Sequence, residues 1–458
     1  MNSDTICALA TAPGGALGII RISGAQALEI LSHIFTKDLT NAAANTIHYG
    51  YIQTFPTLEG LGEVLPQVID EVLVSVFRAP HSYTGEDSAE ISCHGSRYIL
   101  NKVLELLIQH GCRMALPGEF TQRAYLNGKM DLSQAEAVAD LIASSNKATH
   151  EIAMSQLRGH FSSLLAQLRD QLLRLTSLLE LELDFSDHED LEFADRTALF
   201  SLAKEIDKDV TRLAHSFELG TVLKQGIPVA IVGKTNVGKS TLLNRLLKDD
   251  RAIVSDVHGT TRDTIEDTID IQGITFRFID TAGIRQTTDQ VEQIGIERTY
   301  QAIEKARIVL WLIDNQPSTE EINEVLQRTE NKKLIVVCNK SDAADNNRYN
   351  LLNLPFVAIS AKYGTGIDSL EQSIYDAADV PTLTDTDFIV TNARHYDALT
   401  RSHDCIQRVI NGLQMQLSGD LLSEDLRQAL DALAEITGGQ ITPNEVLGNI
   451  FKNFCVGK

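Results

Sequence analysis

Three hydrophobic patterns follow one another along the chain. In the first 125 residues, short apolar runs at 17–24 and 70–77 are separated by loops rich in Gly and Pro, which is typical of strands in a compact α/β domain. At 131–145, and again from Gln156 to Leu183, apolar residues recur at helical spacing, which predicts amphipathic helices, the second of them long. The same period returns after about residue 385.

Between the helical stretches, apolar strands alternate with helical segments. The predicted strands read IPVAIVG, ITFRFIDT, RIVLWLID and KLIVVCN. This alternation predicts a doubly wound α/β sheet. A chain of 458 residues is too long for a single core, and an insertion is tolerated where the ends of the inserted domain lie close together. We therefore predict a multidomain fold, α/β plus all-α, in which an α/β domain is inserted into a discontinuous helical domain. The predicted segments are 1–125, 126–218, 219–382 and 383–458.

The segment 233–240, GKTNVGKS, joins a predicted strand to a predicted helix. It matches G-x-x-x-x-G-K-S, a loop whose backbone N–H groups surround phosphates. We expect Lys239 to reach the β- and γ-phosphates and the Ser240 hydroxyl to ligate Mg²⁺.

Three further motifs follow in the order that GTPases show: D-T-A-G at 280–283, N-K-S-D at 339–342 and S-A-K at 360–362. Asp280 is expected to hold Mg²⁺ through water, and Thr261 to cap the ion. The Asp342 carboxylate can accept two hydrogen bonds from the guanine edge, which adenine does not offer. The sequence thus predicts a Ras-like P-loop GTPase domain. Its predicted GTP-binding residues are Asn236, Val237, Gly238, Lys239, Ser240, Thr241, Ser255, Asp256, Val257, His258, Gly259, Thr260, Thr261, Asp280, Thr281, Ala282, Gly283, Asn339, Lys340, Asp342, Ser360, Ala361 and Lys362.

One departure narrows the class of GTPase. Many GTPases place a Gln directly after D-T-A-G to orient the attacking water, whereas this chain has Ile284 there. An aliphatic side chain cannot orient water. Hydrolysis must therefore use another residue or a different arrangement.

The net charge and the cysteine content limit the cellular location and the binding partners that we expect. The formal net charge of −22 opposes phosphate binding, so the chain is not expected to bind RNA without a basic patch or a basic partner. The six cysteines form no C-x-x-C pair, a pattern that fits a reduced, cytoplasmic protein without a structural zinc site. No apolar run approaches the ~20 residues that cross a bilayer, so we expect no membrane association.

Together these motifs resemble the MnmE family, also called TrmE, of bacterial and organellar tRNA-modification GTPases. The resemblance covers the whole chain and includes SYTGEDSAEISCHG, LPGEFTQRAYLNGKMDLSQAEAVADLI, the GTPase motifs and the C-terminal IFKNFCVGK. It implies an N-terminal α/β domain that binds folate and dimerises, a discontinuous helical-bundle domain and an inserted GTPase domain.

The resemblance also implies an activity and partners. Family members form homodimers and assemble with an FAD-dependent partner, MnmG, as a heterotetramer. Together they add an aminomethyl or carboxymethylaminomethyl group to carbon 5 of the wobble uridine of certain tRNAs. A tetrahydrofolate derivative, in the 5-formyl or 5,10-methylene form, supplies the one-carbon unit, and K⁺ stimulates GTP hydrolysis.

For the K⁺ site the resemblance implies four ligands: the Asn236 side chain, the backbone carbonyls of Ser255 and Val257, and Thr260. A cation there replaces the charge of an arginine finger. Asn236 could instead be a turn-forming residue. The resemblance assigns Glu292 to orient the attacking water, whereas by composition alone Glu292 is an exposed charge.

For the folate site the matching positions are Arg21, Glu90, Lys129 and the terminal Lys458. A carboxylate suits the amino-pyrimidine edge of a pterin, and cations suit the carboxylates of its glutamate tail. The same charges could form surface ion pairs, and Glu86 lies nearby in sequence. Cys455 is a candidate nucleophile or a buried structural thiol. Val456 replaces the usual Ile of the family's Cys-Ile-Gly-Lys end.

Two other functions remain open. The central domain also suits a regulatory or ribosome-assembly GTPase switch, although such proteins usually carry a basic RNA-binding module. A free-standing folate-dependent methyltransferase that uses GTP only as a sensor is the third hypothesis.

Overall fold

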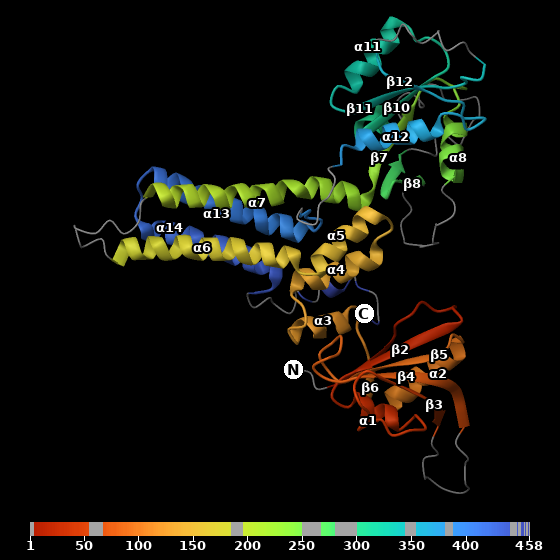
Figure 1. Cartoon of the computed structure of the whole chain (residues 1–458), viewed down its shortest axis with the longest axis vertical. Coiled ribbons are helices and arrows are strands. Elements are labelled where there is room, and N and C mark those ends of the chain that lie inside the picture. Colours follow the sequence, from red (N-terminus) through yellow and green to blue (C-terminus); the bar gives the residue numbers. More distant parts are fainter. Residues whose placement is uncertain are drawn as a thin grey trace. The chain divides into compact units, whose positions relative to one another are not determined.

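The computed structural model describes the chain apart from residues 1–3, 55–66, 185–195, 250–266, 280–299, 344–353, 381–387, 440–446, 448–449, 453, 455–456 and 458. The chain forms two compact units (Figure 1). One comprises Met1–Ala143, Ala153–Asp207 and Arg401–Lys458, and the other comprises Ser144–Ile152 and Lys208–Thr400. Each unit is therefore assembled from segments that are distant in sequence.

The first unit contains a six-stranded, mostly antiparallel sheet in the order β3-β4-β5-β2-β1-β6. Both strands predicted in this region are present, as β2 and β4. The elements are β1 (Thr5–Leu9), β2 (Leu17–Ser23), α1 (Ala27–Ser32), β3 (Thr46–Thr54), β4 (Gln67–Phe77), β5 (Ser88–His94), α2 (Arg97–Gln109) and β6 (Cys112–Met114).

Alternation along the strands separates two faces of this sheet. The face that packs with α1 and α2 carries a core of branched aliphatic residues, including Ile20, Ile22, Val74 and Ile91. The residues between them point to the other face, where Arg21 lies opposite Glu90 in the antiparallel register of β2 and β5. The predicted folate residues of the two strands are thus brought side by side.

The C-terminal segment packs against the start of α3 (Glu119–Leu126). Gly118, which precedes α3, has φ +68°, and a Cβ there would lie 2.8 Å from the Cβ of Phe454. A left-handed conformation and this close approach both require glycine. Phe451 and Phe454 also form an apolar cluster with Leu132 of α4 (Leu132–Ala143). The end of the chain therefore contacts the beginning of the helical part.

The helical part contains α5 (Lys147–Leu157), α6 (His160–Asp184), α7 (Arg196–Gln225), α13 (Ala393–Gln414) and α14 (Gly419–Thr437). Helix α6 packs along α14, and its buried leucines recur at steps of three and four, as predicted. The predicted start of this helix at Gln156 is wrong, because α5 ends at Leu157 and α6 begins at His160. Gly159 between them has φ +80°, which interrupts the helix. Apolar periodicity continues across the break and does not reveal it.

The second unit contains a sheet in the order β12-β11-β10-β7-β9-β8, in which only β8 and β9 pair antiparallel. Separate apolar clusters cover its two faces, so the sheet is doubly wound as predicted. Its elements are β7 (Ile227–Val232), α8 (Lys239–Asp249), β8 (Asp267–Ile271), β9 (Ile274–Phe278), β10 (Ile308–Ile313), α11 (Thr319–Arg328), β11 (Lys333–Cys338), β12 (Phe356–Ala358) and α12 (Ile367–Ala378).

The predicted fold class is confirmed. An N-terminal α/β domain precedes the helices, and the P-loop α/β sheet lies in the chain between α7 and α13, so it interrupts the helical part. No helix in the described ranges is long and apolar enough to cross a membrane.

Candidate functional site

The phosphate-loop motif, residues 233–240, lies between the end of β7 and the start of α8. Ligands bind to parallel sheets at this edge, where a strand ends and a helix begins. Gly233 has φ +152°, and a Cβ there would lie 2.3 Å from the carbonyl oxygen of Leu312 on β10. Gly238 has φ +103°, and its Cβ would lie 2.3 Å from Nδ2 of Asn339. Glycine is therefore required at both positions, at 233 by the close approach of the Leu312 backbone and at 238 by that of the Asn339 side chain.

Lys239 closes this loop on itself. Its Nζ donates hydrogen bonds to the carbonyl oxygens of Gly233 at 2.6 Å and Lys234 at 2.8 Å. Burial lowers the pKa of the Lys239 amine. Phosphate oxygens would give this amine stronger, charge-assisted bonds than the two carbonyls do.

The side chain of Asn339 joins three motifs. It is only 3% exposed, and its Nδ2 donates to the carbonyl of Val237 in the phosphate loop at 2.7 Å. Its Oδ1 accepts from the Ala361 N–H of the S-A-K segment at 3.0 Å. An amide that donates and accepts at once can make both bonds, which explains why Asn stands first in N-K-S-D.

Two further residues of N-K-S-D, Lys340 and Asp342, are also held by their neighbours. Lys340 donates to the carbonyl of Asn236 at 3.1 Å and pairs with Asp314 at 2.6 Å. Asp342 accepts a hydrogen bond from Ser360 Oγ at 2.6 Å. The sequence analysis did not single out Asp314, although it is the acidic residue that ends the predicted strand RIVLWLID.

Asn236, the predicted K⁺ ligand, has an exposed side chain and φ +63°. Asn tolerates this left-handed conformation better than most residues, so the geometry agrees with a turn-forming role. It is equally compatible with an ion ligand. Both interpretations of Asn236 stay open.

Several predicted site residues lie outside the described residues. They are Ser255, Asp256, Val257, His258, Gly259, Thr260, Thr261, Asp280, Thr281, Ala282, Gly283, Glu292, Cys455 and Lys458. Of the two predicted Mg²⁺ ligands, Ser240 is therefore the one that can be placed, in the first turn of α8.

A second cluster lies on the face of the N-terminal sheet away from α1 and α2. Arg21 donates to Oε1 of Glu90 through Nε at 3.0 Å and Nη2 at 2.7 Å. Its Nη1 donates to the carbonyl of Gly457 at 3.1 Å. The guanidinium also lies 5.5 Å from the ring centre of Tyr83 and 5.6 Å from that of Phe120. Residues from four distant segments thus meet at one cation.

The remaining predicted folate residues are placed differently. Lys129 donates to the carbonyl of Pro80 at 2.9 Å and packs beside Gly85, so the backbone of the loop at 78–87 holds it. Lys458 is not described, but its neighbour Gly457 is a partner of Arg21. The structure therefore brings Arg21 and Glu90 together, with the chain end beside them and Lys129 on the adjoining loop.

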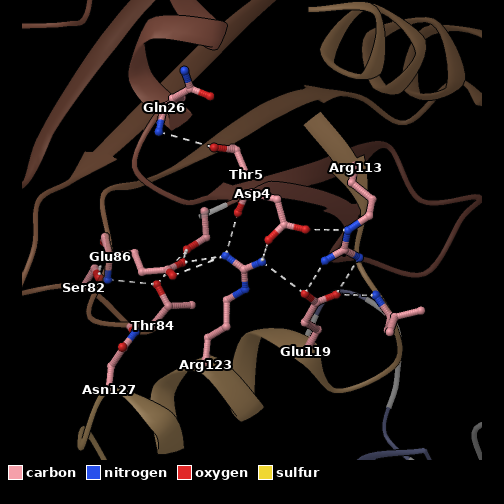
Figure 2. A network of polar contacts seen from close by, with 12 residues as sticks. Asp4, Thr5, Gln26, Ser82, Thr84, Glu86, Arg113, Glu119, Arg123 and Asn127 are labelled. Carbon is pink, nitrogen blue, oxygen red and sulfur yellow. Dashed lines mark hydrogen bonds and ion pairs between the residues drawn. The ribbon is translucent and has the colours of Figure 1, made fainter. Parts of the chain in front are cut away.

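Glu86 belongs to a separate polar network, shown in Figure 2. It accepts hydrogen bonds from Ser23 at 2.8 Å and from Arg123 at 3.2 Å. Arg123 also binds Asp4 and Glu119, each of which pairs with Arg113 as well. The choice of Glu90 over Glu86 as the member of the Arg21 cluster agrees with this arrangement.

The arginines of this network change the acidity of its carboxyl groups. The hydrogen bond from Arg113 lowers the pKa of Asp4 below its ordinary value of 3.8. Burial alone raises the pKa of Glu119, but bonds from Arg113, the Leu116 N–H and Arg123 together bring it below 4.5. Both groups are therefore held in the charged form.

Comparison with known proteins covers the whole chain. Residues 5–129 match the family model described as the GTP-binding protein TrmE N-terminus, and residues 132–455 match that of the MnmE helical domain. A "tRNA modification GTPase MnmE" of Phocaeicola vulgatus is 55% identical over 497 residues, covering 100% of this chain and 99% of that protein. A protein of the same name from Parabacteroides distasonis is 51% identical over 465 residues, covering 99% of this chain and 100% of that protein.

Among solved structures, the G domain of the FeoB iron transporter of T. maritima is 26% identical and covers 33% of this chain and 98% of that domain. The TM-score is 0.24, which supports no structural conclusion.

The lowered pKa values lead to a prediction about pH. A carboxyl group whose pKa is lower in the folded state stabilises the fold above its unfolded pKa, and this contribution is lost as pH falls through the folded value. We therefore expect the stability of the wild-type N-terminal domain to decline below the ordinary values of 3.8 for Asp4 and 4.5 for Glu119. Arg113→Gln should lower the free energy of unfolding at neutral pH by about 1 kcal/mol, because Arg113 is 40% exposed and solvent screens its ion pairs, and it should make this acid-induced decline shallower.

Urea unfolding followed by tyrosine fluorescence, between neutral pH and about pH 3, measures both effects. Lys102→Gln, which breaks an exposed ion pair with Glu105, is the matched control and should leave the pH profile unchanged. Parallel profiles for the wild type and Arg113→Gln would contradict the prediction.

Proposed function

The chain belongs to the MnmE family, and we propose that it is a GTP hydrolase that takes part in the modification of tRNA. The position of Asn339 is the observation that supports the role in GTP hydrolysis, because its side chain links the phosphate loop to the S-A-K segment by hydrogen bonds. These two hydrogen bonds, of 2.7 and 3.0 Å, support one nucleotide site with its phosphate end at the loop and its base end at the S-A-K segment.

Guanine selectivity is assigned to Asp342. Its carboxylate is exposed and oriented by Ser360, so it can accept the N1–H and N2–H₂ donors of guanine. The Ala361 N–H already donates to Asn339. We therefore assign the contact to the guanine O6 to the next backbone N–H of this loop, that of Lys362.

The phosphates are assigned to the loop that Lys239 closes. Ser240 and Thr261 would hold the Mg²⁺ that accompanies the nucleotide. When bound, this ion neutralises charge on the phosphates. Asn236, the carbonyls of Ser255 and Val257, and Thr260 hold K⁺. Glu292 orients the attacking water, a task that Ile284 cannot perform. Asn236 lies in the phosphate loop and is exposed, so its amide oxygen is accessible to an ion, which supports its place in this set.

A tetrahydrofolate derivative is assigned to the Arg21 cluster. Glu90 offers a carboxylate to the amino-pyrimidine edge, while Arg21, Lys129 and Lys458 suit the carboxylates of a glutamate tail. The ring of Tyr83 beside the Arg21 guanidinium is 39% exposed and adds flat surface of the kind that a pterin stacks on. The Phe120 ring on the guanidinium is fully buried and supports Arg21 from the core. The bound folate supplies the one-carbon unit, and Cys455 is a candidate nucleophile beside it.

The partners follow from the family and from charge. We propose that the protein acts in the cytoplasm with an FAD-dependent MnmG protein, and that a group is added to carbon 5 of the wobble uridine. A net charge of −22 gives tRNA little attraction to this chain alone, which supports a partner that supplies cationic surface. We assign the folate-binding domain to 1–125, the helical domain to 126–218 and 383–458, and the GTPase domain to 219–382.

The open face of the N-terminal sheet supports a homodimer. Its outer strands β3 and β4 expose Ile47, Tyr49 and Leu73, which are 68%, 50% and 48% exposed. Tyr49 and Leu73 are direct cross-strand partners, so the apolar side chains are contiguous. A contiguous exposed apolar patch is typical of an interaction surface. We propose that a second copy of the chain covers this face.

The base assignment predicts a change of nucleotide specificity. Asp342→Asn replaces one carboxylate acceptor by an amide donor, so the affinity for GTP should fall by about 100-fold while xanthosine triphosphate, which has an acceptor at carbon 2, gains affinity. Fluorescent-nucleotide titrations measure both changes. Asp368→Asn, in the first turn of α12, is the control and should bind GTP as the wild type does. An unchanged preference for GTP in Asp342→Asn would exclude this role of Asp342.

The dimer assignment predicts a monomeric variant. Leu73→Lys places a charge in the centre of the apolar patch, and burying that charge without a partner is unfavourable. Light scattering at micromolar concentration should give a dimer for the wild type and a monomer for Leu73→Lys. Ile108→Lys introduces the same charge at an exposed position of α2, on the other side of the sheet, and should stay dimeric. A monomeric wild type, or a dimeric Leu73→Lys, would contradict the assignment.

Nucleoside mass spectrometry of bulk tRNA tests the function itself. A strain that lacks the gene should lose the 5-substituted wobble uridine, and the wild-type gene but not Asp280→Ala should restore it. An unchanged nucleoside profile would exclude the modification role and favour a GTPase switch in ribosome assembly. Activity of the isolated protein on tRNA without a flavoprotein would instead favour the methyltransferase hypothesis.

A further inference from the structure

The loop 78–87, which joins β4 to β5, is fixed at its base and at its middle. At the base, Arg78 pairs with Asp87 at 2.7 Å, and Asp87 also accepts from the Ala79 N–H at 2.9 Å. At the middle, Asn127 Nδ2 donates to the carbonyl of Thr84 at 2.7 Å. A connection of this length is ordinarily mobile unless such bonds restrain it.

A third attachment runs through Glu86 (Figure 2). The Glu86 carboxylate accepts from Ser23 Oγ at 2.8 Å and from Arg123 Nη1 at 3.2 and 3.3 Å. Ser23 is fully buried and also lies 2.7 Å from the Thr84 hydroxyl. The Arg123 side chain is 8% exposed, so removing its partner Glu86 would leave a buried charge less well paired, which costs more free energy than breaking a surface pair.

Tyr83 lies between these attachments and contacts the Arg21 cluster. Its ring centre is 5.5 Å from the Arg21 guanidinium, and its hydroxyl is 2.8 Å from Thr121 Oγ1. Thr121 and Arg123 both belong to α3. One helix therefore holds the loop twice, through the Tyr83 hydroxyl and through Glu86.

We propose that Arg123 and Glu86 are a positioning pair for the folate site: they hold the loop 78–87 so that Tyr83 stays beside Arg21. This inference rests on the proposed folate function of Arg21 and Glu90. Within the described residues, Arg21 contacts Glu90, the Gly457 carbonyl and the rings of Tyr83 and Phe120, so the pair acts on Arg21 through the loop.

The geometry requires arginine at position 123. Its two terminal nitrogens bind Glu86 and the Asp4 carbonyl on one side, and the Asp4 and Glu119 carboxylates on the other. The compact ammonium group of lysine cannot span this fork. Arg123→Lys therefore keeps the positive charge but loses the forked set of hydrogen bonds. Glu86→Gln keeps the shape of the side chain but removes its negative charge.

Isothermal titration of the full-length protein with 5-formyltetrahydrofolate tests the proposal. Glu86→Gln and Arg123→Lys should each weaken binding by about tenfold, the scale of one charge-assisted hydrogen bond. GTP hydrolysis and the affinity for GTP should remain those of the wild type, since these residues lie in the unit without the nucleotide motifs. Lys102→Gln, on α2 of the same domain, is the control and should bind folate as the wild type does.

A double-mutant cycle with Tyr83→Leu separates positioning from general destabilisation. If the pair acts through Tyr83, Glu86→Gln should add little to the loss of folate affinity that Tyr83→Leu causes alone. A full tenfold additional loss in that background would overturn the proposal, even if the melting temperature also falls.

The outcomes also distinguish this proposal from the one on which it rests. A wild-type protein that binds the folate, together with Glu86→Gln and Arg123→Lys variants that bind it equally well, would overturn the positioning role and leave the folate function intact. A wild-type protein that does not bind the folate would overturn both.

Discussion

In the nucleotide unit, the close approach of Asn339 to the phosphate loop constrains the motifs that the structure describes. Its amide reaches Val237 because Gly238 has no Cβ, and the same amide holds the Ala361 N–H. A larger residue at 238 would displace the amide, and with it the relation between the phosphate and base regions. The strand order also brings the motifs together. Strands β7, β10 and β11 are adjacent and parallel, so the loops that follow their carboxyl ends lie side by side.

The Arg21 cluster depends on a different constraint, namely the return of the chain end to the first domain. A Cβ on Gly457 would lie 2.4 Å from the carbonyl oxygen of Leu9, and the Gly457 carbonyl accepts a bond from Arg21. Phe451 and Phe454 anchor this end against Gly118 and Leu132. The proposed folate site therefore needs residues from both ends of the sequence. A chain truncated after α14 would keep the sheet but lose one partner of its central cation.

The hydrophobic pattern and the ordered motifs predicted the fold class. Apolar runs identified β2 and β4 in the first sheet and β7, β9, β10 and β11 in the second, and ordered motifs identified the loops that meet at Asn339. The start of α6 could not be predicted, because Gly159 breaks the helix without shifting the apolar period. Likewise, Asp314 and Arg123 act through partners more than 25 residues distant, and no local pattern reveals such pairs. Glu86 and Glu90 have the same chemistry four residues apart, and only their partners separate their roles.

The pairing of the arginines in the N-terminal domain bears on the proposal that a cationic partner holds most of the tRNA. Arg21, Arg78, Arg113 and Arg123 each pair with a carboxylate of the same domain. A paired guanidinium has already exchanged water for a carboxylate, so binding a phosphate would require breaking that pair. These arginines therefore stabilise the arrangement of the N-terminal domain and of the proposed folate site, and they add little to the attraction for RNA. The proposed division of labour follows: this chain holds the nucleotide and the folate, and a cationic partner holds most of the tRNA.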